Sequence, residues 1–576
     1  MLFRTLAIAT ALSIGLAVPA SAQPTAHSSE PQSFRSAETL VSDIPAKPKK
    51  AKKNTKTLVI MAYAKKKDAT TPALLKKVYF DQVDRWMRWQ SAGRQGEKGK
   101  VTKWLKVASN TRCTDKDTYM ARAYAAAKKA GYKPGSYQRI ALYFPLCKAL
   151  TWGGLGSMGS DGNGKYQVWI NGSPYLQVIA HESLHNYGLI HSAAIDCGKV
   201  ALTKKERGCD TTEYGDFFDI MGSSIAMSAS AKREVGWLSP KQSKTVTSGT
   251  KTYTVASADS SSSALKLVRV ELGKGSFLDV EYRAVSRLDR GEPDPSGVQV
   301  RLYEPHTDFD QYGRSLIDVL PNNEITYASI PAGQSWTSPG RVRISVGAVD
   351  GANAVVTVSF KAPAASAPAV PAAPSLSWAP AEDLLRPAAG IAALSPVSGN
   401  GMPVLEYDVQ LANAAGVVGS STVDALGGAV LAASVGDLDY GSYQVRYRAR
   451  NEVGTGGYSA WSAPFVVTEP LPVIAAINVE NQTVPSTFTW SQLRATVLPS
   501  TAGYEISRVY FTVGTAGGPI GTCEAISYDG PIESFHCSSD YDASYFAPGS
   551  YALTVSVTDS FSHAASRTVA FTVAEP

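Results

Sequence analysis

One stretch of eleven residues, from His181 to His191, constrains the fold and chemistry of this 576-residue chain more than any other. His181 and His185 are four residues apart, so on a helix their imidazoles lie on one face, with Glu182 projecting beside them. Gly188 can take the left-handed conformation that ends a helix, and the chain can then bring His191 back to the first two histidines. Three histidines and one open position are the donor set of a catalytic zinc site.

A helix is expected around the first two histidines. Ser173 can cap its free N–H groups, and Pro174 suits the first helical position. Apolar residues then recur on one side of the segment, which indicates a buried face. The sequence therefore predicts a helix over residues 174–187.

A second motif begins shortly after His191, in Tyr214–Gly222, whose sequence is YGDFFDIMG. Together the two motifs resemble the metzincin superfamily of zinc endopeptidases, in which H-E-x-x-H-x-x-G-x-x-H is followed by a methionine-containing turn, the Met-turn. The wording of this turn, and of Lys232–Leu238 after it, is most similar to the gametolysin family of extracellular proteases. The resemblance covers about residues 56–362 and implies an α+β metzincin-like zinc protease domain, with Met221 as the structural residue of the Met-turn.

The resemblance also implies a role for each residue of the site. Zn²⁺ would be held by three imidazoles, those of His181, His185 and His191. Glu182 would act as general base toward a water molecule that the zinc activates. Some metzincins carry a tyrosine two residues after the Met-turn methionine. Ser223 stands at that position here, so no tyrosine is expected to assist from this turn.

Two alternatives compete with a secreted zinc endopeptidase that acts on extracellular proteins or glycoproteins. In the first, Glu206 or Glu213 is the third ligand, which would leave His191 idle and Gly188 without an evident purpose. In the second, the chain is a secreted adhesive or binding protein whose metal site is catalytically silent. Glu182 argues against the second alternative, because a silent relative would commonly lack the base.

The first 55 residues are expected to be targeting and leader segments. Residues 1–22 combine Arg4, an apolar run and Ala20-Ser21-Ala22, which is the pattern of a cleaved secretory signal peptide. Residues 23–55 are polar, rich in Pro and Ser, and end near a lysine run, so a disordered basic leader or propeptide is expected. No later stretch of about 18 apolar residues exists, so no transmembrane segment is expected after signal removal. We therefore expect a secreted, extracellular protein.

The six cysteines are candidates for disulfides, because an extracellular compartment is oxidising. Six cysteines allow 15 connectivities. Proximity in the sequence favours three local pairs: Cys113–Cys147, Cys197–Cys209 and Cys523–Cys537.

The net charge of +7, from 56 basic and 49 acidic residues, is concentrated near the start of the chain. Residues 1–67 carry a net +8 and the remainder a net −1, so the folded body is expected to be close to neutral overall. The lysine run is interpreted as a solvated arm or processing site, with binding to an acidic surface as the alternative. No nucleic-acid partner is expected.

Residues 56–240 are expected to form the catalytic domain. The apolar patterns predict strands at 57–63, 101–107, 137–146 and 165–170, and helices at 72–90 and 115–130. The resemblance places the last of these strands at the edge of the sheet. Its unpaired backbone groups could there bind an extended peptide by adding it as a further strand.

The chain after residue 240 is expected to consist of all-β sandwich domains. Residues 241–362 alternate apolar and polar residues in short runs separated by turn residues, which predicts a β-sandwich subdomain. An Ala- and Pro-rich linker, 363–373, leads to residues 374–468, which resemble a fibronectin type III domain through Tyr443–Gly454. Residues 469–576 are expected to form an immunoglobulin-like domain. These modules carry no cluster of titratable groups, so we expect them to act as spacers or to bind a surface or substrate.

Overall fold

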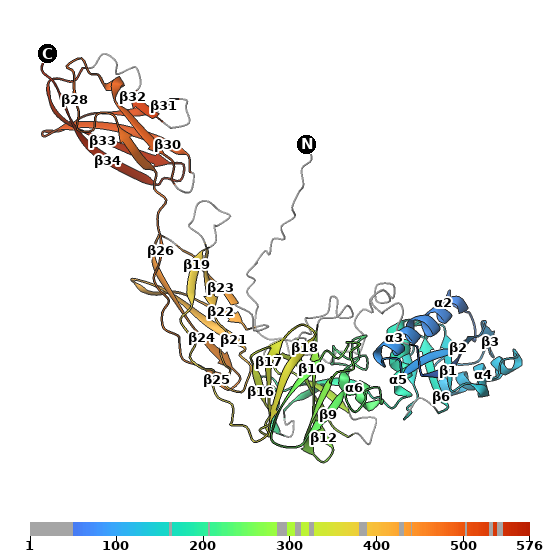
Figure 1. Ribbon diagram of the computed structural model, residues 1–576. Helices are drawn as coiled ribbons and strands as arrows, with labels where there is room; N and C mark the ends of the chain where they lie inside the picture. Colours follow the sequence, from blue (N-terminus) through green and yellow to red (C-terminus); the bar gives the residue numbers. More distant parts are fainter. Residues whose placement is uncertain are drawn as a thin grey trace.

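The computed structural model describes residues 50–576 except 161–163, 205–207, 285–296, 306–312, 322–327, 379–388, 426–430, 439, 501–503, 529–533 and 538–544. The expected signal peptide, nearly all of the expected leader and the alternative ligand Glu206 lie outside the described residues. Strands make up most of the regular structure and are arranged in several sheets (Figure 1). No helix among the described residues is long and apolar enough to cross a membrane.

A mostly parallel sheet forms the first folded unit, blue to cyan in Figure 1. Its main path runs in the order β2-β1-β4-β6-β5. Four of these strands are parallel, and β5 at the end is antiparallel to its neighbour: β1 (Lys53–Tyr63), β2 (Gln95–Val101), β4 (Arg139–Phe144), β6 (Tyr166–Asn171) and β5 (Gly154–Gly156). The middle of β1 and all of β4 are buried, because both faces of the sheet are covered.

Helices cover these two faces. One face packs against α2 (Pro72–Lys77), the π-helical segment η1 (Val78–Val83), α3 (Asp84–Gln90) and α5 (Leu176–His185). The other face packs against α4 (Lys116–Lys129). The first three segments follow one another without a break over the predicted 72–90. The predicted helix at 115–130 is α4, and the carboxylate of Asp115 caps it by accepting from the Thr118 amide at 3.0 Å.

The strand predicted at 101–107 is wrong in its extent. The structure has β2 ending at Val101 and a separate short strand, β3 (Leu105–Lys106). Between them, the Thr102 hydroxyl accepts from the Met61 amide at 3.0 Å and donates to the Lys103 carbonyl at 2.7 Å. These side-chain bonds take the place of the strand ladder. The Lys- and Gly-rich β2 escaped the apolar pattern because it is an edge strand with one side in solvent.

The prediction that the strand before the histidine helix lies at the sheet edge is also wrong. That strand is β6, and its outer side pairs with β5, with Gly154 opposite Ile170 and Gly156 opposite Val168. The edge strand is therefore a glycine-rich segment that the sequence patterns assigned to no element. Three residues with two glycines offer no apolar alternation by which a strand could be recognised.

A β-sandwich follows, and its larger sheet takes in strands from both sides of Pro240. The strand β7 (Ser192–Asp196) begins directly after His191 and pairs in parallel with β14 (Arg314–Ile317). The remaining strands of this sheet are β8 (Asp210–Thr212), β9 (Ser243–Val246), β11 (Leu267–Gly273), β12 (Ser276–Arg283), β13 (Gly297–Tyr303) and β15 (Ser329–Ile330). The chain around the third histidine thus belongs to the sandwich sheet.

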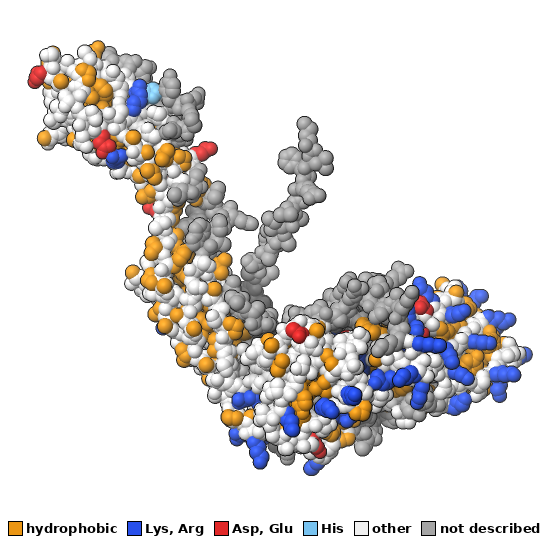
Figure 2. Space-filling model, viewed as in Figure 1, with side chains coloured by type: hydrophobic (Ala, Val, Ile, Leu, Met, Phe, Trp, Pro, Cys, Tyr) orange, Lys and Arg blue, Asp and Glu red, His pale blue; other side chains and the backbone are white. Residues whose placement is uncertain are grey.

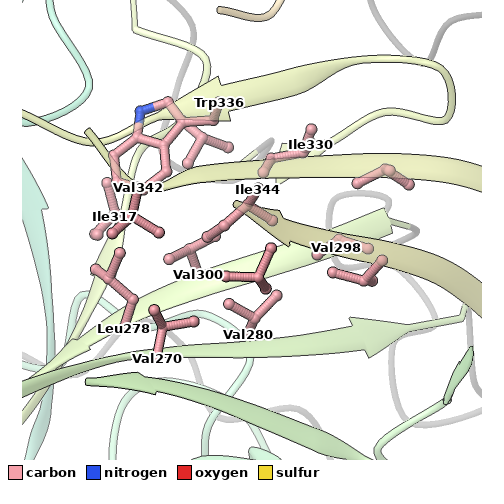
Figure 3. Close-up of a cluster of buried hydrophobic side chains, with 14 of the residues drawn as sticks. Val270, Leu278, Val280, Val298, Val300, Ile317, Ile330, Trp336, Val342 and Ile344 are labelled. Carbon is pink, nitrogen blue, oxygen red and sulfur yellow. The ribbon is translucent and has the colours of Figure 1, made fainter. Parts of the chain in front are cut away.

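The smaller sheet closes the core of the sandwich. Its strands are β10 (Thr250–Ala256), β16 (Ser335–Thr337), β17 (Arg343–Val349) and β18 (Asn353–Ser359). Side chains of the two sheets interlock in the core (Figure 3): Trp336, Val342 and Ile344 pack with Val270, Leu278, Val280, Val298 and Val300. Burial of each such side chain contributes about 1.5–3 kcal/mol, so this core holds the larger sheet, with β7, in place.

Two further β-modules follow along the chain. The first contains β19 (Ser375–Trp378), β20 (Ala389–Leu394), β21 (Glu406–Asn413), β22 (Gly416–Asp424), β23 (Leu431–Asp437), β24 (Gly441–Asn451), β25 (Gly454–Thr455) and β26 (Phe465–Val467). The second contains β27 (Val473–Ile477), β28 (Thr483–Val484), β29 (Arg494–Leu498), β30 (Ile506–Thr515), β31 (Gly518–Tyr528), β32 (Ser534–Cys537), β33 (Gly549–Asp559) and β34 (Ala564–Val573). Met402 and Leu405 of the first module pack into the core of the preceding sandwich.

All three predicted disulfides are confirmed: Cys113–Cys147, Cys197–Cys209 and Cys523–Cys537. The first joins the segment before α4 to the segment after β4, on the same face of the sheet. The second closes the loop between β7 and β8, which leads from the third histidine to the Met-turn. No cysteine is left free.

The charges of the folded chain are segregated along the sequence. Residues 50–150 contain 24 Lys and Arg against 6 Asp and Glu, whereas residues 362–576 contain no lysine and carry a net charge of −11. Figure 2 shows the Lys and Arg side chains gathered over the first folded unit. Exposed lysines there include Lys98, Lys100, Lys103, Lys106, Lys128 and Lys129. The net charge of the folded chain is therefore close to zero although its first unit is strongly basic.

Truncation after Pro240 tests whether the sandwich is needed by the first unit. The fragment 50–240 lacks β14, the parallel partner of β7, and should show no cooperative thermal transition by circular dichroism. A fragment that ends at Val467 lacks only the last module, whose core is built from residues 474–573, and should keep the transition. A cooperative transition in the shorter fragment would show that the first unit is independent.

Candidate metal centre

The helix α5 carries the first two histidines and ends as the sequence required. It is shorter than predicted: Tyr175 is its N-cap, without a side-chain bond, and Ser173 instead donates to the Asn171 carbonyl. After His185 the chain leaves the helix, and Gly188 has φ of 94°. A Cβ at this position would also meet the Gly159 carbonyl at 2.9 Å, so both conformation and space favour glycine.

The three predicted histidines come together. Ring nitrogens of His181, His185 and His191 lie within 4.8 Å of one another, and the ring centroids are 5.0–5.3 Å apart. Among the described residues this is the one group of three or more His, Cys, Asp or Glu with metal-site spacing. Sequence separation alone could not show that the turn after Gly188 closes on this face.

Each histidine uses its Nδ1 atom for a fixed partner. The Nδ1 of His181 lies 2.8 Å from the Ile220 carbonyl, and that of His185 lies 2.7 Å from the Leu189 carbonyl. The Nδ1 of His191 lies 2.5 Å from a carboxylate oxygen of Glu213. A carbonyl can only accept, so Nδ1 of the first two rings carries the proton and the Nε2 lone pair is left for a metal.

Burial keeps these imidazoles neutral. Loss of solvent, together with a smaller effect of the neighbouring histidines, lowers the pKa of His181, His185 and His191 to about 3. All three rings are then neutral at pH 7, which is the form that binds a metal.

The donor set fits zinc. Tetrahedral zinc has Zn–N bonds of about 2.0–2.1 Å, which correspond to separations of roughly 3.3 Å between donors. The observed spacing of up to 4.8 Å is somewhat wider and needs only a small side-chain adjustment to reach this value. Three neutral imidazoles without a thiolate or protein carboxylate are a set that catalytic zinc sites use.

Glu182 lies beside the histidines under the edge strand. It is buried, and loss of solvent raises its pKa to about 8, against a smaller lowering by a hydrogen bond from the Gly156 amide. One of its carboxylate oxygens lies 3.9 Å from Nε2 of His185. A carboxylate with a pKa near neutrality can both take and return a proton.

The glycines of β5 are explained by its contact with α5. A Cβ on Gly154 would come within 2.5 Å of Glu182 Cγ, and one on Gly156 within 2.3 Å of the Glu182 carbonyl. The strand therefore passes directly over the base with no room for a side chain. Sequence analysis had no way to see this, because the need for glycine arises from a tertiary contact.

Met221 is fully buried in the core under the site, in the turn that carries the Ile220 carbonyl. The Met221 carbonyl accepts from the Ser192 amide at 2.9 Å, one residue after His191. The Asp219 carboxylate accepts from the Met221 amide at 2.8 Å and from the Ser228 amide at 3.0 Å. The turn is thereby tied to the third histidine on one side and to the start of α6 (Ala229–Glu234) on the other.

Three buried arginines of the sandwich hold this region. Arg301 pairs with Asp216 at 2.7 Å, and Arg283 donates to the Phe218 carbonyl at 3.0 Å. Arg314 donates to the Ile190 carbonyl at 3.1 Å, directly before His191. All three arginine side chains are fully buried, so their partners are fixed by the cost of leaving a buried charge unpaired.

Glu213, an alternative third ligand in the sequence analysis, has a different place. It contacts the Nδ1 atom of His191, and Tyr214 meets the Nε2 atom of the same ring. Glu213 therefore contacts the other ring nitrogen of His191 and is not one of the three grouped donors.

Tyr214 is a residue that the sequence analysis missed. Its hydroxyl lies 3.0 Å from Nε2 of His191, and the two ring centroids are 4.1 Å apart. Its φ of 61° is rare for an aromatic residue. The segment around Tyr214 has no regular apolar pattern, so its contact with His191 could not have been predicted from the sequence.

Comparison with known proteins supports a metallopeptidase. Residues 98–280 match the family model for gametolysin peptidase M11, a range that holds the three histidines, Glu182 and Met221. The matched range is about a third of the chain. No curated protein matches the sequence.

Solved structures similar to parts of the chain include fibronectin domains. Chicken CNTN1 domains FN1–FN3 have 18% identity, cover 36% of this chain and 67% of that chain, and give a TM-score of 0.17. Fibronectin(III)-like modules of CbhA from Clostridium thermocellum have 17% identity, cover 37% and 92%, and give a TM-score of 0.13. These TM-scores are too low to bear on the fold or the function of this chain.

The buried Glu182 predicts a pH-dependent stability in the metal-free protein. Its pKa is raised from 4.5 to about 8, so its contribution to folding is present below pH 4.5 and lost as pH rises through 8. Glu182→Gln should therefore raise the melting temperature at pH 8.5 by several degrees and leave it unchanged at pH 4. Thermal scans in chelator at both pH values check this.

The histidines titrate in both proteins, so their effect on the difference between the two melting temperatures cancels. Equal melting temperatures at pH 8.5 would contradict the burial of a titrating carboxyl.

Proposed function

We propose that this chain is a secreted zinc-dependent endopeptidase that hydrolyses peptide bonds of extracellular proteins or glycoproteins. The observation that carries the proposal is the convergence of three neutral imidazoles beside a buried carboxylate, within the range similar to the gametolysin peptidase family. The zinc ligands would be His181, His185 and His191. The metzincin fold, the domain boundaries and the signal peptide of the sequence analysis belong to the same proposal.

A zinc ion held by these imidazoles would supply a Lewis acid and would lower the pKa of a water molecule to about 7. Glu182, beside His185, would take a proton from the attacking water as its oxygen adds to the peptide carbonyl carbon. Glu182 would then return this proton to the nitrogen of the leaving amine as the C–N bond breaks. Glu213 keeps the His191 ring in the orientation that this chemistry needs, and Met221 supports the site from below.

The substrate would be held in extended form along β5. This strand ends the sheet next to α5, so an added peptide strand would run close to Glu182. Backbone hydrogen bonds to an edge strand bind many sequences, and they position the scissile carbonyl without a deep pocket. The two C-terminal modules are proposed as spacers or as attachment to a surface or substrate.

The alternative remains a binding or adhesive protein with a silent metal site. Zinc content and cleavage of casein or gelatin by protein lacking residues 1–49, with Glu182→Ala beside wild type, separate the two. We expect about one zinc per chain in both proteins, and cleavage only by wild type, abolished by a chelator. Zinc in both with no cleavage of any protein would favour the binding protein, and no zinc in wild type would refute the site.

The basic first unit predicts a preference among substrates. A basic surface attracts acidic peptides over about 8 Å at physiological ionic strength. For an acidic peptide, kcat/KM should fall as sodium chloride rises from about 50 mM to 500 mM, several-fold or more. A neutral peptide of the same length is the control and should change little. Equal salt dependence for both would show that the charge does not act on substrates.

A further inference from the structure

We propose that Tyr214 is a further catalytic residue, which donates a hydrogen bond to the carbonyl oxygen of the substrate as negative charge develops on it. This inference rests on the proposed peptidase function. It assigns a role that the sequence analysis considered absent, because Ser223 occupies the position at which some metzincins carry a tyrosine.

The first argument is the position of the hydroxyl. It lies 3.0 Å from Nε2 of His191, the ring nitrogen that the contact of Nδ1 with Glu213 leaves for a metal. The hydroxyl therefore borders the place that a metal held by the three histidines would occupy. A group at this place is within hydrogen-bond distance of a carbonyl oxygen that reacts at the site.

The second argument concerns the proton. The Nδ1 atom of His191 faces the Glu213 carboxylate, so Nε2 accepts and the Tyr214 hydroxyl donates. A metal held at Nε2 would use the lone pair that accepts this bond, so the hydroxyl would no longer donate to His191. The hydroxyl can then turn to the nearest oxygen at the site. When water adds to the peptide carbonyl, the C=O π bond breaks and its electrons move to that oxygen, which accepts from Tyr214 while the tyrosine keeps its proton.

The third argument is the backbone. Tyr214 has φ of 61°, in the left-handed region that residues other than glycine rarely adopt. The Ser223 hydroxyl donates to the Tyr214 carbonyl at 2.6 Å and supports this conformation. Ser223, which stands where some metzincins carry a tyrosine, thus supports the loop that carries Tyr214. Tyr214 is also 38% exposed, so its ring can move toward a substrate without disturbing the core.

The test compares zinc-loaded wild type, Tyr214→Phe and Tyr545→Phe. Tyr545 is 64% exposed in the last module and provides the same chemical change away from the site. Loss of one oxyanion donor lowers kcat by about 10²–10³-fold. We expect Tyr214→Phe to show this loss with KM little changed. Its zinc content should remain at the wild-type level, and Tyr545→Phe should match wild type throughout.

A binding measurement gives a readout apart from turnover. A phosphinic pseudopeptide mimics the tetrahedral intermediate, and its affinity by calorimetry should fall in Tyr214→Phe by the same factor as kcat. A reduced-amide peptide lacks the carbonyl oxygen to which Tyr214 would donate, so it should bind both proteins equally. Wild-type kcat and phosphinate affinity in Tyr214→Phe would overturn the role of Tyr214 and leave the peptidase intact. Loss of zinc from the variant would also overturn it, in favour of a metal-holding role. No zinc and no cleavage in wild type would refute the proposed function itself.

Discussion

The candidate site depends on the buried bonds between three arginines of the β-sandwich and the chain around the third histidine. Arg301, Arg283 and Arg314 reach Asp216, Phe218 and Ile190 respectively, all inside the protein. Arg301 and Asp216 form a buried ion pair, and removal of one partner from such a pair typically costs about 3–5 kcal/mol, because the other charge is left without water. The helix α5 can fix two histidines by its own geometry, but the third needs a partner domain to set its position. The sandwich supplies it through β14, which pairs with β7 directly after His191.

The remaining parts of the site follow from this arrangement. The turn that carries Met221 is held by the sandwich and offers the Ile220 carbonyl to His181, so one loop fixes both the floor of the site and a ring orientation. Burial beneath the edge strand β5 raises the pKa of Glu182 to about 8, a proton affinity suited to the role of base that we propose for it. The three histidines, Glu182 and β5 are held in place by the fold itself, which is the preorganisation that the proposed catalysis needs.

The histidine motif, the stop at Gly188 and the three disulfides could be predicted because each is a local pattern, whereas Met221 was identified through the resemblance to the metzincins. Spacing on a helix or proximity in the chain contains that information. The edge strand could not be predicted, because Gly154 and Gly156 are explained only by their distance to Glu182. Tyr214 begins a recognised motif and Glu213 directly precedes it, yet their contacts with the two nitrogens of His191 depend on an irregular loop. The net charge beyond residue 67 is close to zero because a basic first unit and an acidic C-terminal part offset each other, and a sum of charges does not show this separation.

X-ray absorption of the zinc-loaded protein tests the central claim most directly, because it counts the atoms around the metal without a substrate. The account predicts three imidazole nitrogens at about 2.0–2.1 Å, one light oxygen donor and no sulfur. His191→Ala should reduce the number of imidazoles to two or abolish zinc binding, which identifies the third ligand. A spectrum with only two imidazoles in wild type, or one that is unchanged in His191→Ala, would contradict the site.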